Sequence, residues 1–179
     1  MGRHLAKAIQ RRGHKLTWVQ CPEEVQTASD LLKRLRRELP KQDVLVMAAA
    51  ICDVRPEKKS PLKIKKAGLQ TLRLVKNPDV TQELSKLKKP FQTFVGFALE
   101  SKNIQSNALQ KMRAKRLELI LAQRVTSKIT PFGDTRIEGT LYAVDGSEQA
   151  FKSAKKEAIA DTLIGRAEGM ARQKLRLAH

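Results

Sequence analysis

The sequence has few of the residues on which metal or disulfide chemistry depends. Its 179 residues include two cysteines, Cys21 and Cys52, and three histidines. Each cysteine follows a separate expected strand, and the pair lacks the short spacing of metal ligands, so we interpret both as structural thiols in a reducing compartment. Because His4, His14 and His179 are scattered, the sequence contains no recognisable cluster of metal ligands.

Several functional signatures are also missing. No apolar run is long enough to cross a bilayer and no secretion signal opens the chain, so we expect a cytoplasmic protein without membrane contact. There is no Gly-x-Gly-x-x-Gly fingerprint and no glycine-rich loop that ends in Gly-Lys-Ser or Gly-Lys-Thr. No Ser/His/Asp, Cys/His or paired-carboxylate set is suggested either. Redox and hydrolase functions are therefore unsupported.

Acidic residues are scarce relative to basic ones. The 36 Lys and Arg residues against 18 Asp and Glu give a net charge of +18. Such an excess speeds association with polyanions and with phosphorylated substrates, and it favours loose adsorption to nucleic acid. The basic residues are spread over the chain and alternate with periodic apolar positions, as in residues 31–39. This pattern indicates solvated helix faces, so we expect no specific nucleic-acid binding.

The remaining pattern is that of a globular α/β protein. Its length fits one domain with a sizeable core. We expect helices at residues 5–13, 27–39, 79–87, 103–116 and 153–172, and strands at residues 15–20, 43–50, 69–75, 93–98, 117–122, 139–144 and 149–151. This alternation predicts a Rossmann-like three-layer α/β sandwich with a mainly parallel sheet. Asp145-Gly146 predicts the turn of an antiparallel hairpin at one edge.

The strand expected at residues 43–50 is the most informative segment. It is a continuous apolar run that ends in small residues and is followed by Asp53. Such runs are typical of strands buried on both faces of a parallel sheet. Ligands of open α/β sheets bind beyond the carboxyl ends of the strands. The Asp53 carboxylate could therefore bind a sugar hydroxyl or a base amino group, or it could instead cap the loop or pair with Arg55.

Lysines cluster in the segment after Asp53. Lys63, Lys65 and Lys66 belong to a proline- and lysine-rich stretch, residues 55–68, that we expect to be a mobile loop. Ammonium groups bind phosphate oxygens and offset charge that develops at a reacting phosphorus. These lysines could reach the crevice beyond the strand, or they could form only a solvated run. Together with Asp53 they predict a site for a phosphorylated, nucleotide-like ligand.

The turn before the helix at residues 79–87 is a second candidate. Asn77 and Pro78 lead into Asp79, Val80 and Thr81. Asp79 could simply cap the helix and complement its dipole. Alternatively, backbone groups of this turn could contact a base or a phosphate.

Three other side chains have two open interpretations each. Phe97 lies on an expected buried strand, where it could belong to the core or stack on a base. Lys111 and Lys115 are four residues apart and share one helical face. They could form a solvated stripe or a phosphate clamp.

Segments spread over nearly the whole chain resemble phosphopantothenate–cysteine ligase, the phosphopantothenoylcysteine synthetase of coenzyme A biosynthesis. In many bacteria this enzyme is the C-terminal half of a bifunctional flavoprotein. The similar segments are residues 2–22, 46–56, 63–66, 75–80, 95–100, 107–115 and 117–122. The order and spacing of so many segments make the resemblance specific.

The resemblance implies a CTP-dependent ligation of 4′-phosphopantothenate to cysteine through an acyl-cytidylate. It assigns the catalytic role to Lys63. It assigns nucleotide binding to Asp53, Lys63, Pro78, Asp79, Val80, Thr81, Phe97, Lys111 and Lys115. It further implies Mg²⁺ bound with CTP and a homodimer with its sites near the subunit interface. FMN is not expected, because the flavin-binding half is absent.

The sequence also departs from the family pattern. Family members begin with a further strand and a glycine- and serine-rich loop that carries a functional Asn. We expect residues 1–179 to form a single domain that starts at an internal methionine and lacks this strand and loop. The family's later Asn is replaced, since Gln123-Arg124 follows Ala122. The alternative function is a non-catalytic or partner-dependent nucleotide-binding fragment whose basic surface adsorbs nucleic acid.

Overall fold

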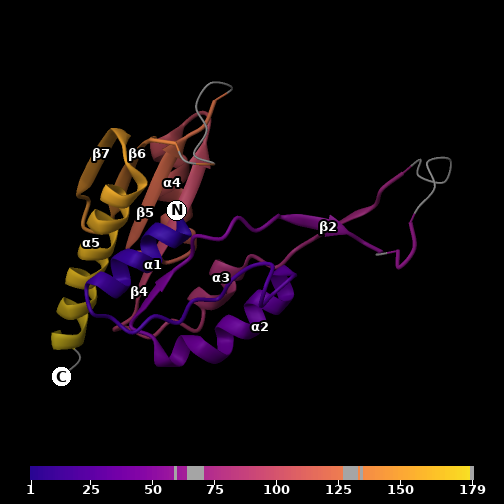
Figure 1. The fold of residues 1–179 in the computed structure, drawn as a ribbon, viewed down its shortest axis with the longest axis horizontal. Coiled ribbons are helices and arrows are strands. Elements are labelled where there is room, and N and C mark those ends of the chain that lie inside the picture. The colour runs from indigo at the N-terminus through magenta and orange to yellow at the C-terminus, as the bar shows by residue number, and fades with distance from the viewer. Residues whose placement is uncertain (59, 64–70, 127–132, 134, 178–179) are drawn as a thin grey trace.

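A five-stranded sheet forms the centre of the fold. The computed structural model describes residues 1–58, 60–63, 71–126, 133 and 135–177. In the sheet order β1-β4-β5-β6-β7 (Figure 1), the strands are β1 (Val44–Val46), β4 (Thr93–Glu100), β5 (Leu119–Arg124), β6 (Ile137–Ala143) and β7 (Glu148–Ala154). The first three strands are parallel, and β6 and β7 add the antiparallel edge hairpin.

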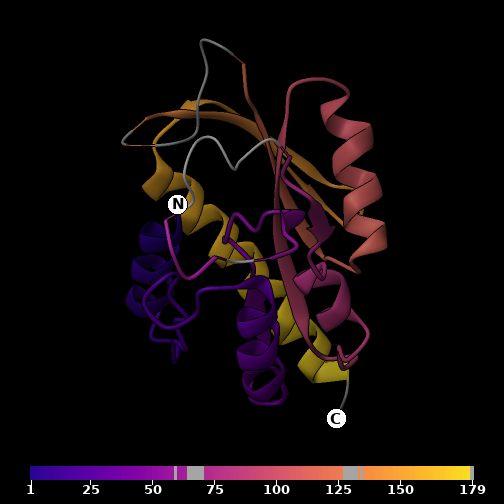
Figure 2. The ribbon, with the colours of Figure 1, turned by 90° about the vertical axis from the view of Figure 1, so that its right-hand side faces the viewer.

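Helices cover both faces of this sheet (Figure 2). One face carries α1 (Gly2–Arg11) and α5 (Lys156–Leu177), and the other carries α2 (Ala28–Glu38), α3 (Val80–Ser85) and α4 (Ile104–Ala114), with the short 3₁₀ helix η1 (Leu39–Lys41) after α2. The Rossmann-like three-layer architecture predicted from the sequence is therefore confirmed. Among the helices of the described residues, none is long and apolar enough to cross a membrane.

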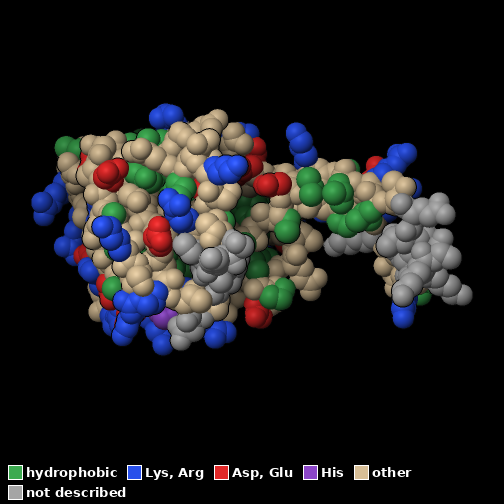
Figure 3. Space-filling view, turned by 90° about the horizontal axis from the view of Figure 1, so that it is seen from above, with side chains coloured by type: hydrophobic (Ala, Val, Ile, Leu, Met, Phe, Trp, Pro, Cys, Tyr) green, Lys and Arg blue, Asp and Glu red, His purple; other side chains and the backbone are tan. Residues whose placement is uncertain are grey.

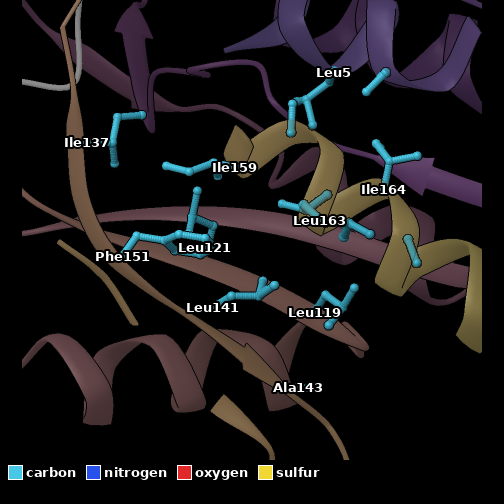
Figure 4. Close-up of a cluster of buried hydrophobic side chains, with 14 residues drawn as sticks. Leu5, Leu119, Leu121, Ile137, Leu141, Ala143, Phe151, Ile159, Leu163 and Ile164 are labelled. Carbon is cyan, nitrogen blue, oxygen red and sulfur yellow. The ribbon is translucent and has the colours of Figure 1, made fainter. Parts of the chain in front are cut away.

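Two hydrophobic cores follow from the alternation of side chains along the strands. Leu119, Leu121 and Leu141 of the sheet face Ile159 and Leu163 of α5, as Figure 4 shows. On the opposite face, the sheet residues Phe94 and Ile120 pack in a second core with Leu31, Leu32, Val80, Leu84 and Met112. The central strands β4 and β5 are thus largely buried, as predicted, but β1, for which burial on both faces was also expected, is only half-buried.

Local sequence signals fix the ends of the predicted helices. α2 begins after Thr27, whose hydroxyl accepts the N–H of Asp30 at 3.1 Å while the Asp30 carboxylate accepts the N–H of Thr27 at 3.2 Å. This reciprocal capping box satisfies two N–H groups that a helix start otherwise leaves unpaired. α1 ends shortly before Gly13, which takes the left-handed conformation that glycine adopts readily.

A two-stranded arm projects from the body of the molecule (Figure 1). β2 (Val54–Pro56) pairs antiparallel with β3 (Leu74–Lys76). We define the arm as residues 54–63 and 71–76. The prediction of a loop throughout residues 55–68 is wrong at its start, and within residues 71–75 the expected strand begins only at Leu74. Residues 64–70, including Lys65 and Lys66, lie outside the described residues.

The strand predicted at residues 15–20 is also wrong. This segment is extended but has no strand partner in the described part of the chain. A strand requires a ladder of hydrogen bonds to a neighbour, and the alternation of apolar residues reports only how side chains are placed. The predicted strand at residues 43–50 forms, but only over Val44–Val46.

A buried cluster of charges joins α5 to the sheet. The Glu118 carboxylate accepts hydrogen bonds from the Lys88 Nζ at 2.6 Å, the Lys174 Nζ at 2.5 Å and the backbone N–H of Phe94 at 2.7 Å. Burial opposes ionisation of Glu118, but the hydrogen bonds from Lys174, Lys88 and Phe94 outweigh it and lower the pKa of this carboxyl. Lys88 also donates to the carbonyl of Arg116 at 2.6 Å. The cluster is consequently a candidate stability element.

Gly139 marks a place where two strands leave no room for a side chain. A Cβ at this position would lie 2.4 Å from the carbonyl oxygen of Ala122 on the neighbouring strand. We expect Gly139→Ala to lower the free energy of unfolding by about 1–3 kcal/mol, because the backbone must shift. Urea denaturation checks this. Gly169→Ala, with open space around it in α5, is the matched control and should stabilise by about 0.5–1 kcal/mol; equal effects would contradict the argument.

Candidate functional site

A cleft of about 1850 Å³ runs along β1 to its carboxyl end. At that end it is lined by the small residues Ala48, Ala49 and Ala50 and by Arg55 and Asn77 at the base of the arm. Small side chains allow a ligand to approach the backbone. This is the position at which open α/β sheets bind ligands.

Asp53 directly precedes β2 at the base of the arm, seven residues after the end of β1. Its backbone carbonyl accepts the N–H of Asn77 at 2.8 Å, and the Asn77 side chain donates to the carbonyl of Cys52 at 2.8 Å. Arg55 donates to the carbonyl of Lys76 at 2.8 Å and to the Asn77 side chain at 3.2 Å. Arg55 is therefore not paired with Asp53, and the exposed Asp53 carboxylate has no hydrogen-bond partner within the described residues.

The turn at Asp79 is brought to this junction through Asn77. The Asp79 side chain accepts the N–H of Gln82 at 3.1 Å, so it caps α3, and its other oxygen lies 2.9 Å from the Lys115 Nζ. Val80 and Thr81 are buried in the core. A ligand at this turn would therefore meet Pro78, the Asp79 carboxylate and backbone groups, and not the side chains of Val80 and Thr81.

Lys111 has a carboxylate partner in the structure. Its Nζ lies 2.6 Å from Glu100 at the end of β4, and Asn107 donates to the other Glu100 oxygen at 2.8 Å. Burial opposes the charge of Glu100, yet the hydrogen bonds from Lys111 and Asn107 lower its pKa. Lys111 and Lys115 share a helical face as predicted, but they contact different acids.

Phe97 lies on the other side of the sheet from these lysines. It is half-buried against the core formed with α1 and α5, whereas α4 packs on the opposite face. Alternation along β4 explains this placement, since Phe94 and Ala98 point toward the α4 side. Within one chain, the structure does not bring Phe97 together with Lys111 and Lys115.

Lys63 is exposed on the outer part of the arm. Figure 1 shows the arm projecting away from the body of the molecule, and Lys63 follows the end of β2 by seven residues. Lys65 and Lys66 lie outside the described residues. Both cysteines are free and exposed, and both line the cleft.

Two residues of the cleft were missed in the sequence. The Asn77 side chain donates to the carbonyl of Cys52 and accepts a hydrogen bond from Arg55 of β2. This role depends on the pairing of β2 with β3, which the sequence alone does not indicate. Lys156, buried at the start of α5, donates to the carbonyl of Gly133. Burial, and then the charge of Lys156, lower the pKa of the amino group at Met1. No local sequence pattern distinguishes Lys156 from its neighbour Lys155, so the burial of Lys156 could not be predicted from the sequence.

The fold and the cleft together define an α/β protein with a candidate ligand site beyond the carboxyl ends of parallel strands. The chain belongs to the family of the DNA/pantothenate metabolism flavoprotein C-terminal domain, whose model matches residues 1–170.

Curated relatives are coenzyme A biosynthesis bifunctional proteins CoaBC. The Escherichia coli K12 protein is 30% identical over an alignment of 179 positions, which covers 92% of this chain and 44% of the relative. The Bacillus subtilis protein is 29% identical over an alignment of 187 positions, which covers 97% of this chain and 46% of the relative. The chain thus spans less than half the length of these relatives.

Solved structures have the same fold. A C-terminal domain of CoaBC superposes with a TM-score of 0.72 at 21% identity, over 95% of this chain and 81% of that one. Cab2 in complex with phosphopantothenate-cysteine superposes with a TM-score of 0.66 at 13% identity, over 98% of this chain and 59% of that one.

Proposed function

We propose that this chain acts in coenzyme A biosynthesis as a CTP-dependent phosphopantothenate–cysteine ligase. The observation that carries the proposal is the family match over residues 1–170. In the proposed reaction, the carboxylate of 4′-phosphopantothenate attacks the α-phosphorus of CTP and expels pyrophosphate. The cysteine amine then attacks the acyl carbon of the acyl-cytidylate and expels CMP, which leaves an amide. Such chemistry depends on positioning and charge neutralisation.

The junction at the end of β1 supports a role in holding the nucleotide. The exposed Asp53 carboxylate is available to accept hydrogen bonds from a sugar or base, since Arg55 is engaged elsewhere. The Pro78-Asp79 turn lies beside it, and Lys115 supplies a positive charge at the same turn. For Phe97 and Lys111 to contact the nucleotide as well, they would have to bind a different part of it or belong to a site shared with a second chain.

Mg²⁺ would enter this site as part of the substrate. Among the described residues there is no group of three or more His, Cys, Asp or Glu side chains that could hold a metal ion. Mg²⁺ is commonly held by one or two carboxylates together with phosphate oxygens. We therefore propose that CTP carries the ion, with Asp53 and Asp79 as the acids at the junction.

We also propose a homodimer formed through the arm. The arm exposes Val54, Leu62, Leu72 and Leu74, whose accessible fractions are 43%, 79%, 56% and 54%. Figure 3 shows hydrophobic side chains gathered along the projecting arm. Exposed apolar patches of this kind mark interaction surfaces. Contact with a second copy would place Lys63 against another chain.

Leu74→Glu should convert this dimer to a monomer, because a carboxylate would be buried without a partner in the contact. Sedimentation velocity measures the change in mass. Leu177→Glu alters a leucine at the end of α5 that is more exposed than Leu74, 81% against 54%, and should leave the mass unchanged. A wild-type chain that sediments as a monomer would refute the proposed dimer.

Lys115→Gln should weaken CTP binding about tenfold, which corresponds to about 1.4 kcal/mol for the loss of one charge-assisted contact. Isothermal titration with CTP and Mg²⁺ measures this affinity. Lys86→Gln is the matched control, since Lys86 on the same side of the fold pairs only with Glu83 in the structure. Equal affinities for both variants would remove Lys115 from the nucleotide site.

Pyrophosphate release is the direct test of the proposed function. The assay contains the chain, CTP, Mg²⁺, 4′-phosphopantothenate and cysteine. Release that requires 4′-phosphopantothenate supports the ligase. A folded chain that releases none, but binds nucleic acid at physiological salt without competition from CTP, would favour the partner-dependent or adsorbing alternative.

A further inference from the structure

A pocket beside the carboxyl end of α4 shares no lining residue with the cleft in the part of the chain that the structure describes. We call it the α4 pocket. It measures about 350 Å³, at the lower end of the roughly 300–1,000 Å³ that small-molecule sites occupy. Its walls come from the segment after α3, from the end of α4 and from α5, which ends on the side of the body away from the arm (Figure 1). None of these lining residues is among those assigned to nucleotide binding.

Positive charge dominates the α4 pocket. Its described lining includes one carboxylate, Glu118, and five cationic side chains, which are Lys88, Lys89, Arg113, Arg116 and Lys174. Glu118 is already paired with Lys88 at 2.6 Å and with Lys174 at 2.5 Å. Within the described residues, no carboxylate forms a salt bridge with Lys89, Arg113 or Arg116. The pocket therefore has an excess of positive charge that these residues do not neutralise.

The effect of this excess charge is visible at Lys88, whose side chain is only 6% exposed. Burial lowers the pKa of its ammonium group, and the charges of Lys174 and Arg116 lower it further, while hydrogen bonding to Glu118 opposes both. The cations thus repel one another across the pocket. An anion placed between them would remove part of this repulsion.

Arg116 occupies a backbone position that favours glycine. Its φ is 51°, and the N–H groups of Arg116 and Leu117 donate to the carbonyls of Arg113 and Met112 at 3.2 and 2.9 Å. These bonds form the Schellman motif that ends many helices, in which the left-handed residue is usually glycine. The backbone alone closes the end of α4 in this way, so the motif gives no reason for an arginine. A guanidinium group held at this strained position therefore indicates a role of the side chain.

Most donors of the two arginines are unused within the described residues. Arg116 donates to the carbonyl of Ser85 at 3.1 Å, whereas a guanidinium group has five N–H donors. The Arg113 side chain, in the last turn of α4, makes no hydrogen bond or ion pair with the described residues. A cation here also complements the helix dipole, but Arg113 supplies that charge without backbone strain. Paired N–H donors of arginine match the oxygens of a phosphate group.

The α4 pocket also has an apolar part. Met112 and Leu117 line it as members of the core on the α4 face of the sheet, and Val144 lines it with 64% of its surface exposed. Pro90 is exposed there as well. A small apolar group would cover Val144 and Pro90, whereas inorganic phosphate would leave them in contact with water. The pocket thus favours a ligand that combines one phosphate group with a small apolar body.

We propose that the α4 pocket binds a small phosphomonoester with an apolar body, whose phosphate group contacts Arg113 and Arg116. Such a phosphate group carries close to two negative charges at pH 7, so it offsets more of the excess charge than a carboxylate would. The site is separate from the cleft, since the two have no described lining residue in common. This inference does not depend on the proposed reaction, and its test measures binding and not turnover.

Phenyl phosphate is the probe for this site, titrated into the isotope-labelled chain and followed by NMR spectroscopy. The backbone amides of Arg113, Arg116, Leu117 and Val144 should shift in a saturable manner, with a dissociation constant of about 1 mM or lower. Benzoate has the ring but a single negative charge, so it should bind more weakly. Benzyl alcohol lacks the charge and should cause no shifts at these amides.

Arg116→Gly separates binding from folding. Glycine adopts the left-handed backbone readily, so the variant should keep an unfolding transition close to that of the wild type. Its affinity for phenyl phosphate should fall at least about tenfold, because charge-assisted hydrogen bonds are lost, and Arg113→Gln should act in the same direction. Arg37→Gln, at an exposed arginine of α2 outside the pocket, also removes one charge and should change the affinity by less than about twofold.

Saturable shifts at the pocket that weaken selectively in Arg116→Gly and Arg113→Gln support the proposed site. Should Arg116→Gly fail to fold, the comparison of Arg113→Gln with Arg37→Gln decides. Shifts at Asp53 and Asp79 without shifts at the pocket, equal affinities of the pocket variants and Arg37→Gln, or shifts that benzyl alcohol reproduces would each overturn the proposal.

Discussion

Lys63→Gln should lower CTP-dependent pyrophosphate release by about 10²–10³-fold, the loss that follows removal of one preorganised group that stabilises transition-state charge. Glutamine keeps much of the length and polarity of the side chain but removes the positive charge that would face the reacting phosphorus or the acyl-cytidylate. Because Lys63 is exposed on the arm, the substitution should leave the unfolding transition unchanged. The measurement is a single-turnover assay with the substrates described above.

Lys58→Gln is the matched control for this experiment. Lys58 is a second exposed lysine of the arm, so both variants lower the net charge by one. If long-range attraction of CTP were the only role of the arm, the two variants would lose activity equally. Their difference from the wild type would then shrink by the same amount as the salt concentration is raised. A selective loss with Lys63→Gln would assign it a direct role. Equal losses would contradict that role.

The arm also shows what a sequence can and cannot predict about this fold. The start of the helix at Thr27 and the turn at Asp145-Gly146 depend on local sequence, and both lie where the sequence predicted them. By contrast, β2 pairs with β3 about 20 residues away in the chain. β2 lacks the apolar alternation of a half-buried strand, so composition indicated a loop there. The alternation at residues 69–75 did predict a strand, of which Leu74 and Val75 belong to β3.

The prediction of a strand at residues 15–20 was wrong for the opposite reason. Their alternation is that of a strand, but strand formation also needs a neighbour, and no neighbour is paired with them in the described structure. The alternation correctly indicated an amphipathic extended segment, but it contained no information about a neighbouring strand.

The candidate site was predictable residue by residue but not as an arrangement. Asp53 and Asp79 were chosen because each lies at the end of an element, and the fold joins them through Asn77. Phe97 was assigned to nucleotide binding by the family resemblance, and the alternation of side chains along β4 directs it to the face opposite Lys115. The face of the sheet on which a side chain lies depends on the register of the whole sheet, and no single sequence motif determines that register.

The largest effect on stability is expected at the buried charge cluster. Glu118→Ala should lower the free energy of unfolding by about 3–5 kcal/mol, because it leaves the Lys88 ammonium group buried without its counter-charge. The side chains of Lys88 and Glu118 are only 6% and 10% exposed. Urea denaturation monitored by circular dichroism measures the loss. Glu148→Ala, at an exposed acid of β7, should change stability by no more than about 0.5 kcal/mol.

A double variant and a pH series separate the charge from the packing. Combining Glu118→Ala with Lys88→Met removes the unpaired charge and should recover part of the loss. Because the pKa of Glu118 is lowered in the folded chain, its ionised form stabilises the fold above the unfolded pKa of about 4.3. That contribution disappears as pH falls through the folded pKa. The difference in stability between wild type and Glu118→Gln should therefore shrink below about pH 4; a difference that stays constant with pH would mean that packing alone accounts for the cluster.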